Sequence, residues 1–210
     1  MLHGIFSVPI VVQKVKEHEK IKSYLVENTR PDFEESGHNT STCMMYTDLW
    51  GQGKKVDWPF LHNYYVPQVQ QLMEETNFDM KIPWRYNINS WYNWTKYAGW
   101  QELHDHVVGP ISYAWCGVHY VVFDKEKHEP TRFWNPNADQ IQAHWPSNQV
   151  KDNPPYCQDT YYSPEVNEGD IVWFPPWLKH QALQQMTDSP RLTVAINLTL
   201  VDHPLVNFNE

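Results

Sequence analysis

The sequence predicts a mostly β protein, an antiparallel sandwich or barrel that is backed by helices. Helix-like periodicity is confined to the residues before Pro83, and short strand-like runs separated by turns make up the rest. Prolines number 16 against 8 glycines, so many of these turns have a fixed φ. Because 210 residues with 15% aromatics can bury a core of their own, we expect a single domain over residues 1–210. Its N-terminal part would be residues 1–82, and its β core would be residues 83–201.

The N-terminal part begins with a β-branched run and continues with a helical pattern. Residues 4–15 favour a strand, in which Pro9 indicates an edge position or a bulge. Residues 17–28 carry apolar side chains at helical spacing with acidic residues early, which predicts a helix. We expect both elements to pack onto a larger sheet and to carry no catalytic group.

A polar segment separates this helix from a second one. Residues 30–55 predict a loop with a short strand near residues 44–46. Asp57 is a good N-cap and Pro59 suits the first helical turn, so the second helix is expected to begin there. Pro67 is expected to kink or divide that helix.

The β core is predicted from alternating apolar residues and from β-branched and aromatic side chains. The expected strands cover residues 84–94, 112–123, 131–134, 171–174 and 191–201. A further extended piece starts at Leu103. Residues 137–164 carry four prolines and predict a long loop, of the kind that forms a lid or a binding loop.

The composition argues against several partners and compartments. The net charge is −9 and no run of lysines and arginines occurs, so we expect neither a nucleic acid nor a membrane as a partner. Cys43, Cys116 and Cys157 are widely spaced and odd in number, which does not suit a disulfide framework. The sequence has neither a signal-peptide pattern nor an apolar stretch long enough to span a bilayer. We therefore expect a cytoplasmic protein.

Three histidines form the candidate metal site. In a strand, residues two apart point to the same face, so His104 and His106 could both reach one ion. His180 follows a strand that prolines terminate, where a loop can turn a side chain inward. Asp105 would point away from that ion unless the strand ends there. Three ligands on one side of an ion suit a catalytic metal with open positions, and imidazole suits iron, zinc and copper about equally.

Arg191 is the second candidate site residue. It begins a strand whose apolar face consists of Leu192, Val194, Ile196 and Leu198, and this face is expected to pack against the helices. The other face consists of Arg191, Thr193, Ala195 and Asn197, and it would look into a barrel. A guanidinium with a hydroxyl two residues later can bind a carboxylate through several hydrogen bonds. A half-exposed strand with a salt-bridged arginine is the alternative.

The order of these motifs resembles that of the 2-oxoglutarate- and iron(II)-dependent oxygenases, and above all a small group found in phage and marine bacterial genomes. The resemblance covers about Tyr86 to Leu200. Its motifs are Ser90-Trp91, His104-Asp105-His106, Cys116-Gly117-Val118-His119-Tyr120, Glu168-Gly169-Asp170, Phe174-Pro175-Pro176-Trp177-Leu178-Lys179-His180 and Arg191. Residues 1–80 do not take part in it.

The resemblance implies a double-stranded β-helix (a cupin-like jelly roll) with the N-terminal helices packed on the outer sheet. It also implies Fe(II), 2-oxoglutarate and O2 as cofactor and cosubstrates. A host cytoplasm would be the location if a phage carries the gene.

The resemblance further implies roles for individual residues. The metal ligands would be His104, His106 and His180. Asp105 is the alternative, either as a ligand or as an acceptor that holds an imidazole. The distal carboxylate of 2-oxoglutarate would be bound by Arg191, Thr193 and Tyr120, whereas Trp91 and Asn197 would line the substrate pocket.

A hydroxylase that converts 2-oxoglutarate to succinate is the expected function. The alternatives are a three-histidine cupin dioxygenase that does not use 2-oxoglutarate, and a jelly-roll binding module without activity. The substrate is expected to be a small molecule or a protein. Residues 137–164 and 30–55 are the expected substrate-facing loops. A helix near residues 58–77 would supply the contact if the protein forms a homodimer.

Overall fold

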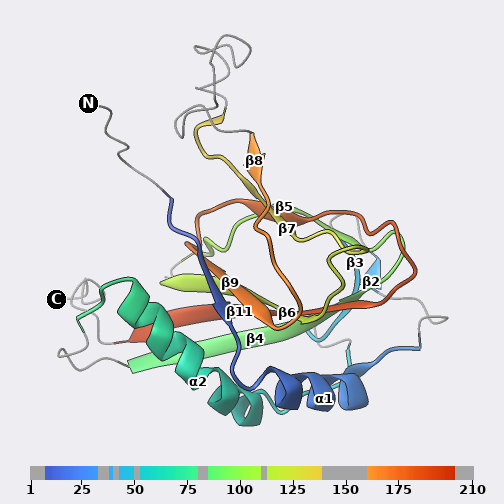
Figure 1. The fold of residues 1–210 in the computed structure, drawn as a ribbon, viewed down its shortest axis with the longest axis horizontal. Coiled ribbons are helices and arrows are strands. Elements are labelled where there is room, and N and C mark those ends of the chain that lie inside the picture. The colour runs from blue at the N-terminus through green and yellow to red at the C-terminus, as the bar shows by residue number, and fades with distance from the viewer. Residues whose placement is uncertain are drawn as a thin grey trace.

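The computed structural model describes residues 8–32, 38–39, 43–49, 53–79, 85–109, 113–138 and 160–201. In these residues, eleven strands form one curled antiparallel sheet, in the order β1-β9-β6-β11-β4-β3-β5-β10-β7-β8 with β2 on β3 (Figure 1). The strands are β1 (Val11–Lys14), β2 (His38–Asn39), β3 (Cys43–Thr47), β4 (Arg85–Thr95), β5 (Trp100–His104), β6 (Trp115–Val122), β7 (Thr131–Trp134), β8 (Tyr161–Tyr162), β9 (Asp170–Phe174), β10 (His180–Ala182) and β11 (Arg191–Val201). This is the predicted double-stranded β-helix.

Strand β3 is where the sheet folds over on itself. Its C-terminal half pairs with β4 through Tyr46 and Thr47, and its N-terminal half pairs with β5 through Cys43 and Met44. A larger sheet (β1, β9, β6, β11 and β4) therefore faces a smaller one (β5, β10, β7 and β8), and the candidate site residues lie between them. β1 and β3 show that the predicted N-terminal part also contributes strands to this sheet.

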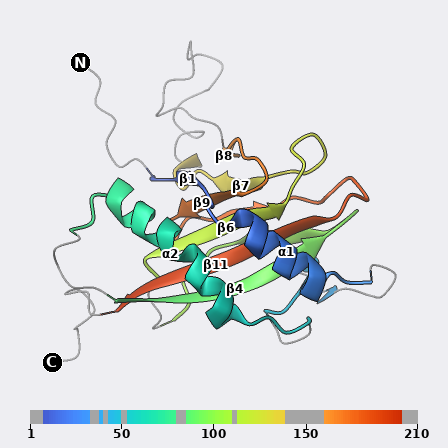
Figure 2. The same ribbon diagram turned by 60° about the horizontal axis from the view of Figure 1, so that its bottom comes forward.

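The two helices cover the outer face of the larger sheet (Figure 2). They are α1 (His18–Thr29) and α2 (Trp58–Glu75). The core beneath them is built from the apolar stripes of both helices and the outward residues of the sheet, among them Ile21, Leu25, Leu61, Leu72, Trp173, Leu192, Val194, Ile196 and Leu198. Each fully buried aliphatic side chain of this kind contributes roughly 1.5–3 kcal/mol. The predicted apolar face of the last strand is therefore confirmed as the face that holds the helices.

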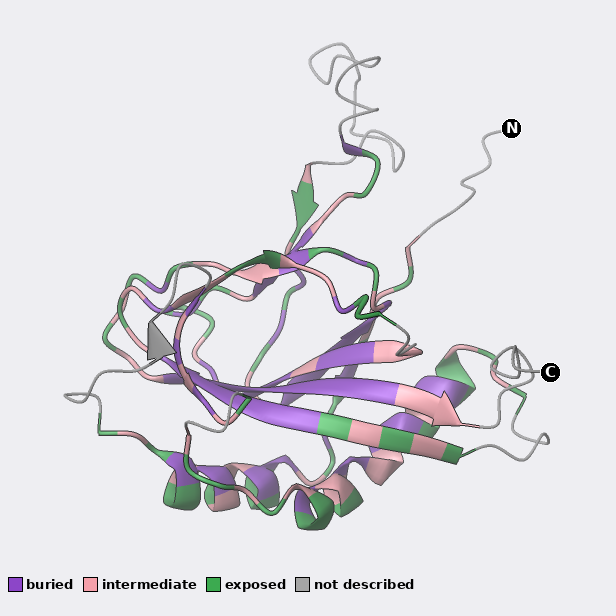
Figure 3. Cartoon of the chain, turned by 180° about the vertical axis from the view of Figure 1, so that it is seen from behind, coloured by how far each residue is buried: buried purple, intermediate pink, exposed green. Residues whose placement is uncertain are grey.

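A second core fills the space between the two sheets beside the candidate site. It contains Cys116, Tyr120, Phe123, Phe133, Val166, Val172, Phe174 and Leu178. Figure 3 shows that β4 and β11 are buried along the part that spans this interior and become more exposed at the opposite end. The core of the protein thus has two layers, one outside the larger sheet and one inside the curl.

One glycine is required by the packing of these layers. Gly117 of β6 pairs with Trp173 of β9, and a Cβ added at Gly117 would lie 2.7 Å from Cε3 of that indole. Since the indole is fully buried, it has no room to move away. A larger residue at Gly117 would therefore displace β6 from β9.

Most predicted elements occur within a few residues of their expected bounds. The second helix begins after Asp57, whose carboxylate accepts a hydrogen bond from the Phe60 backbone N–H at 3.1 Å. Pro67 does not divide it, because the helix runs on to Glu75. Strands β2, β8 and β10 were not predicted. They have only two or three residues, which is too short to show alternation.

Some predictions lie outside the described residues. These are the first residues of the N-terminal strand, residues 33–37, 40–42 and 50–52 of the polar segment, residues 84 and 112 at the starts of two predicted strands, Cys157, residues 139–159 of the long loop and the end of the chain after residue 201. Within the described residues, neither helix is long and apolar enough to cross a membrane.

Candidate active site

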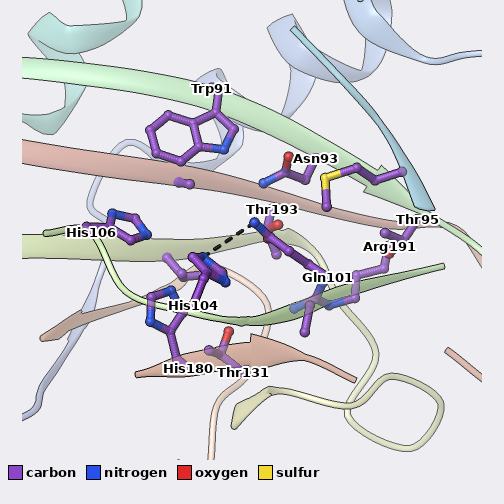
Figure 4. Close-up of a pocket in the computed structure, with 14 residues that line it drawn as sticks. Trp91, Asn93, Thr95, Gln101, His104, His106, Thr131, His180, Arg191 and Thr193 are labelled. Carbon is purple, nitrogen blue, oxygen red and sulfur yellow. Dashed lines mark hydrogen bonds between the residues drawn. The ribbon is translucent and has the colours of Figure 1, made fainter. Parts of the chain in front are cut away.

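His104, His106 and His180 come together inside the curl (Figure 4). Their ligand nitrogens all lie within 4.8 Å of one another, and within the described residues this is the sole group of that kind. His104 ends β5 and His180 begins β10, and the two residues are paired across these strands. His106 lies two residues beyond β5 and is held there by its backbone N–H, which donates to the Pro176 carbonyl at 2.8 Å. The motif around Pro176 thus positions two of the three histidines.

The hydrogen bonds of the three rings fix which nitrogen carries the proton. Nδ1 of His104 lies 2.8 Å from the Glu102 carbonyl, and Nδ1 of His180 lies 3.0 Å from the Leu178 carbonyl. Nδ1 of His106 lies 2.5 Å from Oδ1 of Asn197. A carbonyl oxygen can only accept, so each Nδ1–H donates and each Nε2 carries the lone pair of its ring. All three rings are therefore in the tautomer that binds a metal through Nε2.

Burial keeps these imidazoles neutral. Desolvation lowers the pKa of His104 and of His106 below the usual value for histidine. The pKa of His180 is lowered further, because it is almost fully buried and because the other two rings oppose a third positive charge. A neutral ring is the form that a metal ion requires, so protons compete weakly for this site near neutral pH.

Asp105 has a different role from its neighbours. Its Oδ1 accepts a hydrogen bond from the Val107 backbone N–H at 3.0 Å, and its carboxylate is not part of the histidine group. We predicted that His106 reaches the ion because residues two apart in a strand share a face. Strand β5 ends at His104, so this explanation was wrong. The turn that Asp105 caps carries His106 inward instead.

Arg191 lies in the same pocket as the histidines and lacks an ionic partner among the described residues. Its side chain is 2% exposed, and its Nε has no hydrogen-bond partner in the part of the chain that the structure describes. Burial lowers the pKa of the guanidinium, and the ring of Tyr120, 5.6 Å from Cζ, is its nearby aromatic contact. A buried charge without a partner is unfavourable by several kcal/mol. This end of the pocket therefore has a buried cation without an anionic partner among the described residues.

The pocket is lined from both sheets. Its lining residues are Met45, Trp91, Asn93, Thr95, Gln101, His104, His106, Val118, Thr131, His180, Ala182, Arg191, Thr193 and Ala195. On the larger sheet they form cross-strand pairs: Trp91 with Ala195, Asn93 with Thr193 and Thr95 with Arg191. Trp91 stacks on His106, with ring centroids 5.9 Å apart and planes at 29°. The pocket therefore has a histidine end, walled by Trp91, and an arginine end.

Two predicted site residues lie beside the pocket and do not line it. The Tyr120 hydroxyl is fully buried and accepts a hydrogen bond from the Thr131 backbone N–H at 3.0 Å. Asn197 lies behind His106, which donates to it. Tyr120 contacts Arg191 and Asn197 contacts His106, whereas Trp91 and Thr193 line the pocket.

Several polar lining residues were not predicted. Asn93 and Thr95 follow Trp91 at intervals of two on β4, so alternation was the available signal. Gln101 lies three residues before His104, and its Nε2 is 3.4 Å from Nε2 of His104. In the described part of the chain, Oδ1 of Asn93 and Oγ1 of Thr95 have no hydrogen-bond partner.

Solved structures with the same fold include several oxygenases. A prolyl-4-hydroxylase from Pseudomonas putida is 11% identical, with a TM-score of 0.54 and coverage of 91% of this chain and 92% of that chain. An oxidoreductase of the 2OG-Fe(II) oxygenase family from Burkholderia pseudomallei is 9% identical, with a TM-score of 0.56 and coverage of 90% and 84%. HygX from Streptomyces hygroscopicus, with nickel, 2-oxoglutarate and hygromycin B bound, is 12% identical, with a TM-score of 0.52 and coverage of 91% and 82%. Identities this low establish the fold alone.

The family comes from the sequence itself. No curated protein matches the chain. The family model described as "Putative 2OG-Fe(II) oxygenase" matches residues 89–197, which is more than half of the 210 residues and includes all three histidines and Arg191. The chain therefore belongs to the 2-oxoglutarate- and iron(II)-dependent oxygenases, which are enzymes that use Fe(II), 2-oxoglutarate and O2.

Proposed function

We propose that this oxygenase is a hydroxylase in which His104, His106 and His180 hold Fe(II), and Arg191 with Thr193 binds the distal carboxylate of 2-oxoglutarate. One observation carries the proposal: a buried arginine without an anionic partner among the described residues shares a pocket with three imidazoles whose Nε2 atoms carry the lone pairs. The substrate is proposed to be a small molecule or a protein.

The donor set fits iron. Three imidazole nitrogens would hold the ion and would leave positions open for the keto acid and O2. Imidazole nitrogen is a ligand that Fe(II) accepts, and carbonyl oxygens that accept from Nδ1–H, as they do here, raise the basicity of Nε2. Because the Asp105 carboxylate already caps a turn, His106 is the better candidate for the second ligand.

When bound, iron and 2-oxoglutarate supply the oxidising chemistry, in which 2-oxoglutarate is decarboxylated to succinate. The protein positions the reactants and excludes water. Asn197 and the Glu102 carbonyl orient two of the ligand rings, so the site is set before the metal arrives. Trp91 and Phe174 pack against His106 and keep that side of the site apolar. At the other end, Arg191 neutralises a carboxylate and Thr193 can donate a further hydrogen bond.

The test is anaerobic binding of Fe(II) and 2-oxoglutarate, followed by its visible charge-transfer band. We expect the wild type to give the band, and His180→Ala to give neither iron binding nor the band. Arg191→Ala should keep iron but lose the band at 2-oxoglutarate concentrations that saturate the wild type. Iron binding by the wild type with no band would overturn the assignment of this pocket.

A pair of neighbouring variants distinguishes the two candidates for the second ligand. Asp105→Asn preserves the size of the side chain and one acceptor oxygen, so we expect it to keep its iron. His106→Ala removes one of three imidazoles and should release it. The opposite result would make Asp105 the ligand. With a substrate in hand, transfer of label from 18O2 into the product would separate hydroxylation from other oxidations.

A further inference from the structure

Gln101 is a polar lining residue that lies between the two ends of the pocket. It comes from β5, three residues before His104, and its side chain lies between His104 and Arg191 (Figure 4). Its Nε2 is 3.4 Å from Nε2 of His104, the atom that is proposed to bind iron. The contact therefore involves a nitrogen that the metal needs.

The direction of this hydrogen bond follows from the tautomer of His104. Nδ1 of that ring donates to the Glu102 carbonyl at 2.8 Å, so its Nε2 carries no proton and can only accept. The Gln101 amide must then be the donor. An imidazole nitrogen has one lone pair in the plane of the ring, and it cannot accept from an amide and coordinate a metal at the same time.

Metal binding consequently releases the Gln101 amide. A donor that has lost its acceptor in a largely buried pocket needs a new one, since an unpaired buried polar group is unfavourable. The same pocket contains Arg191, Thr193 and the unpartnered hydroxyl of Thr95, which together suit an anion. A carboxylate or keto oxygen of 2-oxoglutarate, lying between His104 and Arg191, would be such an acceptor.

We infer that Gln101 is a positioning residue that couples iron binding to cosubstrate binding: its amide donates to His104 in the empty site and to 2-oxoglutarate once iron is present. The inference rests on the proposed function of the pocket. It implies that the 2-oxoglutarate site is complete only after the metal has displaced the amide, so the metal binds first.

The two hydrogen bonds make opposite contributions to the two affinities. The bond to His104 stabilises the metal-free state, so its removal strengthens iron binding. The bond to 2-oxoglutarate stabilises the loaded state, so its removal weakens cosubstrate binding. A hydrogen bond of this kind changes an equilibrium constant by roughly 2- to 10-fold. A residue with a purely structural role would not separate the two affinities in this way.

The experiment compares Gln101→Met with the wild type, because methionine has a similar length and no donor. Anaerobic titration with Fe(II) alone should show affinity raised about 2- to 10-fold, and titration of the iron-loaded protein with 2-oxoglutarate should show affinity lowered by a similar factor. The charge-transfer band should also move. Gln101→Glu, which cannot donate when ionised and adds a negative charge, should change both affinities in the same directions and by more.

Gln181→Met is the matched control. Gln181 lies on the neighbouring strand β10, opposite Arg132, and does not line the pocket, so both affinities should stay at wild-type values. If both Gln101 variants bind iron and 2-oxoglutarate as the wild type does, or if both affinities fall together, the coupling is overturned and the proposed function stands. If the wild type binds iron but not 2-oxoglutarate, the proposed function of the pocket fails and the coupling fails with it.

Discussion

The two ends of the pocket differ in how their polar groups are satisfied. At the histidine end, every Nδ1 has a carbonyl acceptor, and only the Nε2 atoms remain for a ligand. At the arginine end, Nε of Arg191, Oγ1 of Thr95 and Oδ1 of Asn93 are buried and have no partner among the described residues. The histidine end is thus preorganised by the protein itself, whereas the arginine end has polar groups that the described residues leave unpaired.

The two ends also come from different kinds of strand. The histidines lie at or beyond the ends of β5 and β10, which have five and three residues. Arg191 and Thr193 lie on β11, which has eleven residues and is held between β4 and β6 beneath the helices. Short strands and their turns can aim three rings at one point, and a long, helix-backed strand can keep a charge buried. Substitutions at each end should therefore differ in what they do to the empty protein.

The largest effect on binding is expected from His180→Ala. It removes one of three ligands and leaves a cavity between Phe133 and Phe174, so iron affinity should fall by more than about 100-fold. Titration with Fe(II) under anaerobic conditions measures this loss. His128→Ala is a suitable control, because His128 does not line the pocket. Its Nδ1 accepts from the Asp124 backbone N–H, and its Nε2 donates to the Ser189 carbonyl. Equal iron affinity in His180→Ala and the wild type would contradict the metal assignment.

Arg191→Met should affect binding and stability in opposite directions. The loss of a charge-assisted pair is expected to weaken 2-oxoglutarate binding roughly 10- to 100-fold. The empty protein should become more stable, by about 1–3 kcal/mol, because an unpaired buried cation is replaced by an apolar chain of similar length. Urea denaturation with and without 2-oxoglutarate tests both points. A variant that is less stable than the wild type when empty would indicate that Arg191 has a partner within the protein.

The sequence predicts the arginine end more completely than the histidine end. Alternation along residues 191–201 places Arg191 and Thr193 on the inner face and Leu192 on the outer one, because a long strand keeps its parity. The helices and the large strands follow from the same periodicities. Strands of two or three residues, such as β8 and β10, have too few residues to show any.

At the histidine end, the sequence predicted that the three rings come together, but it did not predict the contacts that hold them there. The hydrogen bond between His106 and the Pro176 carbonyl joins two turns far apart in sequence, and no local pattern encodes it. The same is true of Asn197, whose position on the inner face was predicted but whose contact with His106 depends on that turn. Residue types identify the ligands, whereas long-range contacts decide which neighbours orient them.

Asn197→Ala should weaken the histidine end without removing a ligand. The Nδ1–H of His106 would lose its acceptor, and its ring would be free to rotate or to change tautomer. Loss of such an acceptor typically lowers metal affinity about 10- to 100-fold. Asn197→Asp retains an acceptor oxygen and should bind iron nearly as the wild type does, which makes it the matched control. If Asn197→Ala binds iron normally, the preorganisation of this end does not depend on that hydrogen bond.

Thr95→Val is expected to have the smallest effect and to separate the two ends most cleanly. Thr95 faces Arg191 across β4 and β11, is 3% exposed, and its hydroxyl is without a partner in the described residues. Valine has almost the same shape, so the variant removes only the hydroxyl. If that hydroxyl binds the carboxylate, affinity for 2-oxoglutarate should fall about 2- to 10-fold while iron affinity stays unchanged, and the free energy of unfolding of the empty protein should rise by roughly 1 kcal/mol.

Thr95→Ser restores the hydroxyl and should restore binding. Thr199→Val, on the part of β11 that does not line the pocket, should change neither affinity. A loss of stability in empty Thr95→Val would mean that the hydroxyl already has a partner within the protein, and the contrast between the two ends would then rest on Arg191 and Asn93.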